Sequence, residues 1–154
     1  MSDAAPYVSS FVLEYAYKRS LGPVLSKFFS ALKAGVLLGG RTQSGDLLVP
    51  PTEYDPRTGH DLAGLERVSG QGTLTSWTWV ANPQPQHPCD RPFAFGLVRL
   101  DGTHSDLLHV VLADRSVLQS GARVRLSWRP ASASDALSHS ARLVAFRTAA
   151  TSPS

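Results

Sequence analysis

The sequence contains one cysteine, Cys89, and only three lysines beside twelve arginines. A single cysteine excludes an intrachain disulfide and is consistent with the reducing cytoplasm. No apolar run approaches the roughly 20 residues that a membrane-spanning helix needs. The first ten residues, MSDAAPYVSS, also lack the basic and apolar regions of a secretory signal. We therefore expect a cytoplasmic protein that does not contact a membrane.

The sequence also lacks the motifs that carry catalysis: there is no glycine-rich phosphate loop, nucleophile elbow or pair of carboxylates. Cys89 and His87 lie two residues apart in a segment with four prolines, 81–92, but no carboxylate is placed to orient the histidine. His104 and His109 do not share a strand face, so they do not predict a metal site. We expect a non-catalytic chain without a cofactor, in which Cys89 is a free loop thiol.

What the sequence does contain is enough apolar residue, 42% of 154, for one compact domain with a small appendage. The net charge is +3, and residues 78–154 carry eight basic and five acidic side chains. Such a mildly cationic half suits a phosphate-bearing ligand or nucleic acid, and it also fits an ordinary surface.

A helix is predicted after Gly22-Pro23, because proline is favoured at the first helical position. Gly35 is placed as the glycine that follows the helix. Apolar residues recur on one face of this helix: Val24, Leu25, Phe28, Phe29 and Leu32. A helix this short is marginal alone, so the stripe must be buried, either on the chain's own core or on a partner protein.

Residues 41–59, RTQSGDLLVPPTEYDPRTG, have the spacing of a zinc ribbon without its ligands. Such a ribbon grips the ion with thiolates or imidazoles from two tight turns. Four other residues stand at the ligand positions, and a glycine follows each pair: Arg41, Ser44, Asp55 and Thr58, with Gly45 and Gly59. We expect no structural zinc. Either an Arg41–Asp55 ion pair or packing on a neighbour would then hold the turns, and packing is favoured because a surface pair contributes little.

Five strands are predicted in the second half, at 73–80, 93–100, 107–113, 123–129 and 141–147, with turns at Asp101-Gly102 and Gly121. Five strands with short connections fit a small closed barrel of the OB type. The fourth strand alternates, with Val124, Leu126 and Trp128 inward and Arg123, Arg125 and Arg129 outward. The segment 81–92 joins the first two strands and is either a binding loop or a solvated surface loop.

Trp77 and Trp79 lie on one face of the first barrel strand, since residues two apart point the same way. Together with the arginines at 123, 125 and 129 they allow three interpretations. They cover the barrel core, they form a protein interface, where Trp and Arg dominate, or they bind single-stranded nucleic acid by stacking and charge. A net charge of only +3 weakens the third interpretation.

Several motifs resemble the family of zinc-ribbon plus OB-fold proteins that are small partner subunits of thiolase-like enzymes. They are Tyr17-Lys18-Arg19-Ser20, the helix after Gly22-Pro23, Gly45 through Pro51, and the segment SGQGTLTSWT at 69–78, which is similar to that family's first OB strand. The resemblance runs from about Tyr15 to Phe146. It implies a mainly β chain: an N-terminal arm and helix (1–35), a metal-free, degenerate rubredoxin-like ribbon (36–62), a five-stranded OB-fold barrel (63–147) and a tail (148–154).

By this resemblance the chain is expected to bind and stabilise a thiolase-superfamily enzyme that acts on acyl-CoA, such as a sterol-carrier-type thiolase or a steroid side-chain retro-aldolase. The assembly would be a hetero-oligomer of two plus two chains, in steroid or fatty-acid side-chain degradation. The residues expected to contact the partner are Tyr17, Arg19, Val24, Phe28, Leu32, Tyr54, Trp77 and Trp79. Arg123 and Arg125 are expected to meet coenzyme A near the acyl-CoA entrance. The alternative is a single-stranded nucleic-acid-binding OB-fold protein.

Overall fold

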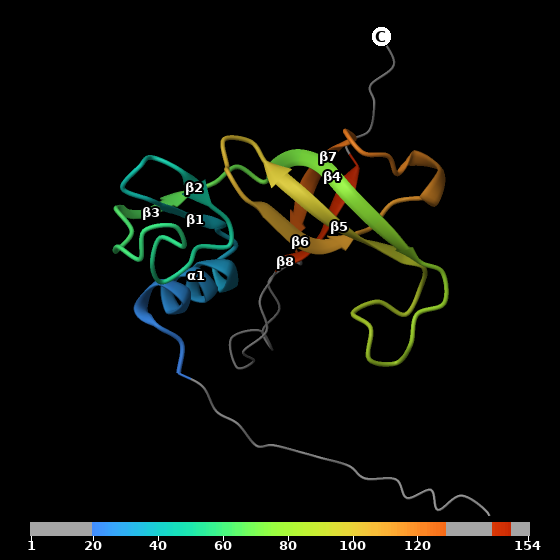
Figure 1. Ribbon diagram of the computed structural model, residues 1–154. Helices are drawn as coiled ribbons and strands as arrows, with labels where there is room; N and C mark the ends of the chain where they lie inside the picture. Colours follow the sequence, from blue (N-terminus) through green and yellow to red (C-terminus); the bar gives the residue numbers. More distant parts are fainter. Residues whose placement is uncertain (1–19, 129–142, 149–154) are drawn as a thin grey trace, which may run out of the picture.

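The computed structural model describes residues 20–128 and 143–148. One helix and a small sheet lie beside a closed barrel (Figure 1). The helix α1 spans Pro23–Lys33, with Pro23 at its first turn and Gly35 beyond its end at φ +76°. Phe28 and Leu32 are its buried residues. The predicted helix and its terminal glycine are therefore confirmed.

The first amides of α1 donate their hydrogen bonds to a side chain that is distant in the sequence. Gly22 is the N-cap residue and provides no side chain. Instead, the carboxylate of Glu53 accepts the backbone N–H groups of Val24 (3.2 Å) and Leu25 (2.8 Å). A side chain on residue 22 would collide with this carboxylate, since a Cβ there would lie 2.2 Å from Cδ of Glu53. The helix is thus fixed to the ribbon that follows it.

The ribbon contains a three-stranded antiparallel sheet in the order β2-β1-β3. Its strands are β1 (Leu38–Arg41), β2 (Leu47–Leu48) and β3 (Gly64–Arg67). β1 and β2 form an antiparallel hairpin around residues 43–46. β3 lies in the range that we assigned to the OB-fold, but it pairs with the free edge of β1 and so completes the small sheet.

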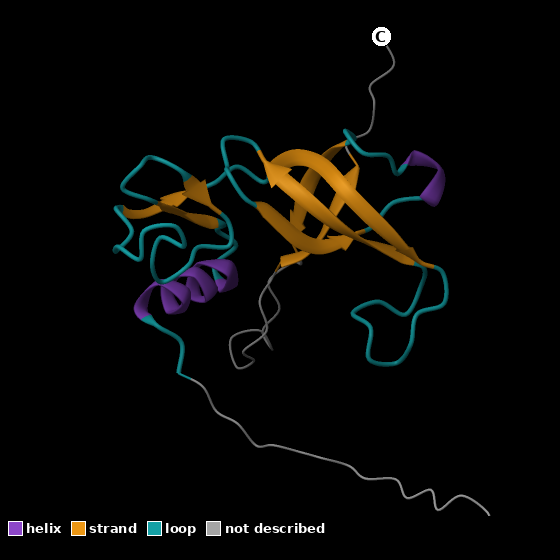
Figure 2. Cartoon of the chain, in the orientation of Figure 1, coloured by secondary structure: helices purple, strands orange, loops and turns teal. Residues whose placement is uncertain are grey.

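The barrel closes in the order β4-β5-β6-β8-β7, with β7 returning to β4. Its strands are β4 (Gln71–Val80), β5 (Phe93–Leu100), β6 (Asp106–Val111), β7 (Arg123–Trp128) and β8 (Leu143–Thr148). A short 3-10 helix, η1 (Arg115–Val117), precedes β7 and was not predicted. The predicted mainly β fold, with one helix and a five-stranded barrel, is confirmed (Figure 2).

A β-bulge between Leu74 and Ser76 lets β4 keep the same face inward along its length. Simple alternation would place Leu74 and Trp77 on opposite faces. The extra residue, Thr75, shifts the parity. As a result, both Leu74, which is fully buried, and the half-buried Trp77 and Trp79 contact the same core.

One buried cluster joins the two parts of the molecule. It includes Phe28 and Leu32 of α1, Val49 of the ribbon, and barrel residues such as Leu74 and Phe146. Three hydrogen bonds between the ribbon and the barrel reinforce it. His104 donates its N–H to Leu47 (2.8 Å), and the Ser105 hydroxyl bonds both the N–H (2.7 Å) and the carbonyl (3.0 Å) of Val49.

A second, smaller cluster lies outside the barrel, under segment 81–92. Phe93, Val110 and Ala145 are buried there. The ring of His87 meets Phe93 edge-on at 5.8 Å. Within the described ranges, no helix has the length and apolarity needed to cross a membrane.

Candidate functional site

The two turns that would hold zinc in a metal ribbon are retained as backbone geometry. In the first turn Thr42 and Asp46 are hydrogen-bonded and Gly45 has φ +93°. In the second, Gly59 has φ +72° and donates its N–H to the carbonyl of Asp55 (2.8 Å). Such left-handed positions favour glycine because it lacks a Cβ.

An arginine joins the two turns. The Arg57 guanidinium donates to the Ser44 hydroxyl (2.8 Å) and forms an ion pair with Asp46. Ser44 also contacts the hydroxyl of Thr42 (2.9 Å), which accepts the N–H of Asp46 (3.0 Å). We call this network of Arg57, Ser44, Asp46 and Thr42 the arginine clamp.

Of the two alternatives for holding the turns, the Arg41–Asp55 ion pair, which was the less favoured, does not form. Arg41 pairs with Glu66 of β3 and also donates to the carbonyl of Gly45 (2.6 Å). Asp55 is only 2% exposed, and its carboxylate accepts the backbone N–H of Arg57 (2.9 Å). This hydrogen bond lowers the pKa of Asp55, against the opposing effect of its burial, and a hydrogen bond from Thr58 lowers it further. The Asp55 carboxylate therefore stabilises the turn in which it lies by accepting backbone hydrogen bonds.

The residues at the degenerate ligand positions do not fit zinc. Two are hydroxyl residues, one is a cation engaged with Glu66, and the carboxylate of Asp55 is used by backbone amides. Zinc in such ribbons takes cysteine and histidine. Elsewhere in the described ranges, no three His, Cys, Asp or Glu side chains converge. His104 Nδ1 accepts the N–H of Leu47 (3.0 Å), whereas burial lowers the pKa of His109.

The predicted partner-binding residues separate into buried and accessible groups. Phe28 and Leu32 are each 5% exposed and belong to the chain's own core, so a partner cannot reach their side chains in this fold. Val24 is half-buried and lines a groove of about 540 Å³ together with the 59%-exposed Tyr54. Tyr17 and Arg19 lie outside the described residues, as does Arg129.

The two arginines expected to meet coenzyme A lie in different surroundings. Arg123 is held by Asp101 through two bonds of 2.8 and 2.6 Å, and this pairing lowers the pKa of Asp101. Arg125 is exposed and lies directly opposite Arg147 of β8. Trp77 and Trp79 pack partly on the barrel core, and Trp79 also lines a pocket at the end of the barrel.

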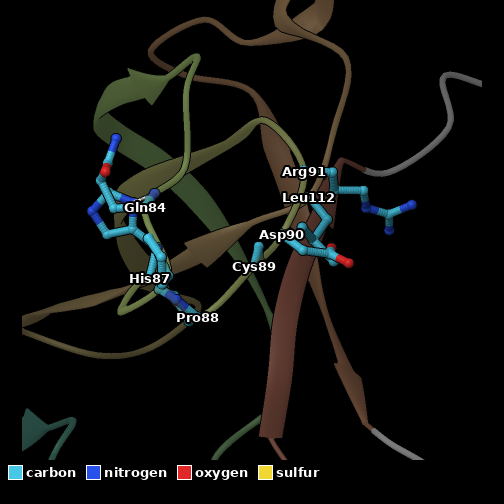
Figure 3. Close-up of a pocket in the computed structure, with 8 residues that line it drawn as sticks. Gln84, His87, Pro88, Cys89, Asp90, Arg91 and Leu112 are labelled. Atoms are coloured by element: carbon cyan, nitrogen blue, oxygen red, sulfur yellow. Dashed lines mark hydrogen bonds between the residues drawn. The ribbon is translucent and has the colours of Figure 1, made fainter.

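Segment 81–92 lines an open surface pocket of about 740 Å³, but its side chains are not arranged for nucleophilic catalysis. Figure 3 shows Gln84 and His87 on one side and Asp90 and Arg91 on the other, with Cys89 between them. Nδ1 of His87 accepts the N–H of Gln84 (2.9 Å). Burial raises the pKa of Cys89, which favours the neutral thiol over the nucleophilic thiolate.

Sequence reasoning missed the arginine clamp and the convergence of cations at the end of the barrel. The sequence contains only a weak indication of the clamp: Arg57 stands between the degenerate ligand positions 55 and 58, and Asp46 directly follows the first turn. The cations had none, since Arg91, Arg115 and Arg147 come from distant parts of the chain.

Comparison with known proteins bears on this arrangement. Residues 65–129 match the family model described as the C-terminal OB-fold domain of ChsH2. A DUF35 domain-containing scaffold protein from Pyrococcus furiosus is 27% identical over 93 residues, which cover 60% of this chain and 68% of that protein.

Two solved structures share the fold. A chain of the Ltp2–ChsH2(DUF35) aldolase superposes with a TM-score of 0.64 and 22% identity, covering 85% of this chain and 98% of that one. A DUF35-family protein of unknown function from Sulfolobus solfataricus superposes with a TM-score of 0.62 and 18% identity. The match covers 84% of this chain and 85% of that one. The resemblance to ribbon plus OB-fold partner subunits is thereby confirmed: residues 65–129 are similar to the C-terminal OB-fold domain of ChsH2, within a chain that has the fold of DUF35 proteins.

Proposed function

We propose that this chain is a non-catalytic accessory subunit that binds and stabilises an enzyme. The observation that carries the proposal is the likeness in fold to nearly the whole of one chain from the Ltp2–ChsH2(DUF35) aldolase. The similarity to a protein named a scaffold agrees with it. The arrangement around Cys89 and His87, which lacks an activated nucleophile, is consistent with a non-catalytic role.

We further propose that the partner is a thiolase-superfamily enzyme acting on acyl-CoA, a sterol-carrier-type thiolase or a retro-aldolase, in steroid or fatty-acid side-chain degradation. Two chains of each kind would form the hetero-oligomer. These details rest on the motif resemblance at 17–20, 45–51 and 69–78.

The accessible apolar side chains around α1 are the docking surface that we propose for this enzyme. Leu21 is 48% exposed, Phe29 40% and Tyr54 59%. Tyr54 also lines a groove with Val24 and Leu65, which offers a recess for a partner side chain. Exposed aromatic residues next to a recess are typical of the central contacts in protein interfaces.

The test is affinity capture of the tagged chain from its native cell extract, followed by mass spectrometry. We expect a thiolase-like enzyme in near-equal amount. Tyr54→Asp and Phe29→Asp should reduce its recovery about tenfold or more, as for central interface residues. Leu108→Asp is the matched control, because Leu108 is 63% exposed on the barrel, away from α1.

Two results would contradict the proposal. One is a chain captured without any enzyme. The other is equal loss of the partner in the Leu108→Asp variant, which would place the contact on the barrel.

Single-stranded nucleic acid is the second candidate ligand, favoured by one observation. Trp79 lines the same pocket as three arginines, and aromatic rings beside cations are the usual means of holding single strands. Affinity for an oligonucleotide that falls steeply with salt would support it.

A further inference from the structure

A cationic pocket of about 480 Å³ lies at one end of the barrel, beyond the residues for which a coenzyme A contact was expected. Its charged lining comes from three separate elements: Arg91 from segment 81–92, Arg115 from η1 and Arg147 from β8. Trp79 of β4 forms an aromatic wall. The barrel thus brings three guanidinium groups and an indole to one recess.

These three arginines share one property that Arg67 and Arg125 also have: no carboxylate of the described residues forms an ion pair with them. Four other arginines each form an ion pair with a carboxylate: Arg41, Arg57, Arg99 and Arg123. For the three pocket arginines, the described part of the chain contains no such pair. Asp114 is the single acidic residue of the lining, so the pocket has an excess of positive charge.

The neighbouring strand adds to this charge. Arg125 on β7 lies directly opposite Arg147 on β8, and both are exposed. Like charges in this position repel each other and destabilise a sheet. A bound anion would offset the repulsion, because a guanidinium holds a phosphate through two parallel hydrogen bonds.

We propose that this pocket binds the phosphate groups of a phosphorylated purine nucleoside, with Trp79 against the ring. The indole provides a flat apolar surface and the arginines neutralise the phosphates, so a ligand with both parts uses the whole lining. This inference rests on the proposed function, since acyl-CoA ends in a 3′-phosphorylated adenosine diphosphate. It assigns that end to Arg91, Arg115 and Arg147, whereas Arg123 is already neutralised by Asp101.

The experiment is titration calorimetry of the full chain with adenosine 3′,5′-bisphosphate at low salt. We expect saturable binding that weakens as salt screens the charges. Arg115→Gln and Arg147→Gln should each weaken it about tenfold, the effect of losing one charged hydrogen-bonding group. Arg67→Gln is the matched control, because Arg67 is an exposed arginine at the end of β3, outside the pocket.

Trp79→Leu tests the aromatic wall separately. It should weaken adenosine 3′,5′-bisphosphate but leave the affinity for pyrophosphate, which has no ring, within about twofold. Two results would overturn the assignment: no binding at about 1 mM ligand, or equal weakening by Arg67→Gln and Arg115→Gln. Preference for a single-stranded oligonucleotide over the bisphosphate would overturn it as well.

Enzyme capture separates this inference from the proposed function. Suppose that the parent chain and the Arg115→Gln variant both capture the enzyme but that neither binds the bisphosphate. The pocket assignment then fails and the accessory role stands. If the bisphosphate binds at the pocket but no enzyme is captured, the accessory role fails and the pocket stands.

Discussion

At the scale of single residues, Arg57 has the unusual task of holding together two turns that a metal ion joins in related folds. Its guanidinium reaches Ser44 and Asp46 across the turns while remaining 64% exposed. An exposed contact of this kind stabilises a protein only modestly. Its effect should therefore be local and should be measured in the turns.

Replacing Arg57 by alanine should lower the free energy of unfolding by about 0.5–1 kcal/mol. Amide hydrogen exchange at residues 42–46 should accelerate more than exchange in the barrel strands, because only the clamp is lost. Arg67→Ala is the control, an exposed arginine outside the clamp. Unchanged exchange in the first turn would show that the clamp holds nothing.

Asp55 gives a prediction about pH. Its pKa is lowered in the folded chain, chiefly by the N–H of Arg57. A lowered folded pKa means that the carboxylate stabilises the fold above its unfolded pKa, near 3.8, and that this contribution disappears as pH falls through the folded value.

The Asp55→Asn variant should therefore melt at a lower temperature than the parent chain at pH 7. The difference should begin to shrink as pH falls below about 4, near the unfolded pKa, and should disappear as pH passes the lower pKa of the folded carboxyl. Melting temperatures from pH 2 to 8 provide the measurement. A difference that stays constant over this range would exclude ionisation of Asp55 as its cause.

At the scale of secondary structure elements, α1 depends on a carboxylate from outside its own sequence. Glu53→Ala should lower the free energy of unfolding by about 1–2 kcal/mol, because the amides of Val24 and Leu25 lose their acceptor. Denaturant unfolding followed at 222 nm is the measurement. Asp61→Asn, an exposed change further along the same loop, should have little effect.

Two strand glycines, Gly72 and Gly64, differ in the space around them, so alanine substitutions at the two positions should have different effects on stability. A Cβ at Gly72 would lie 2.5 Å from the carbonyl oxygen of Arg99 on the paired strand β5, whereas a Cβ at Gly64 would meet nothing within 4 Å. Gly72→Ala should therefore cost about 1–3 kcal/mol, as overpacking does. Gly64→Ala should be neutral or slightly stabilising. Equal results for the two variants in chemical unfolding would contradict this account.

The sequence was sufficient to predict α1 and the five barrel strands, because each shows a clear apolar period and is bounded by turn residues. It was not sufficient for β3, whose four residues alternate weakly and gain order from the edge of β1. Nor did it predict the bulge at Thr75, since parity along a strand changes without any change in composition. Side-chain pairing was the hardest to predict, since Arg41 forms its ion pair with Glu66 and not with Asp55.

At the scale of the whole molecule, the ribbon and the barrel should unfold together. They share a buried cluster and the bonds from His104 and Ser105 to the second strand of the ribbon. Tryptophan fluorescence reports on the barrel, because all three tryptophans lie in β4 and β7. Ellipticity at 222 nm reports largely on α1. The two transitions should coincide in the parent chain.

Ser105→Ala should remove part of this coupling. Both backbone groups of Val49 would lose their partner, at a cost of about 1–3 kcal/mol. The helix signal should then change at a lower denaturant concentration than the fluorescence. Coincident transitions in this variant would mean that the apolar cluster alone couples the two parts.

The arginine clamp has a consequence for how the protein is made. A thiolate-bound zinc ribbon folds only after the ion has been delivered, so its supply follows zinc homeostasis and is exposed to chelators and oxidants. The Arg57 guanidinium and the hydroxyls of Ser44 and Thr42 are part of the chain itself. They do not depend on a supply of metal, and chelators cannot remove them. We therefore expect the turns of this ribbon to form together with the rest of the fold, without zinc delivery.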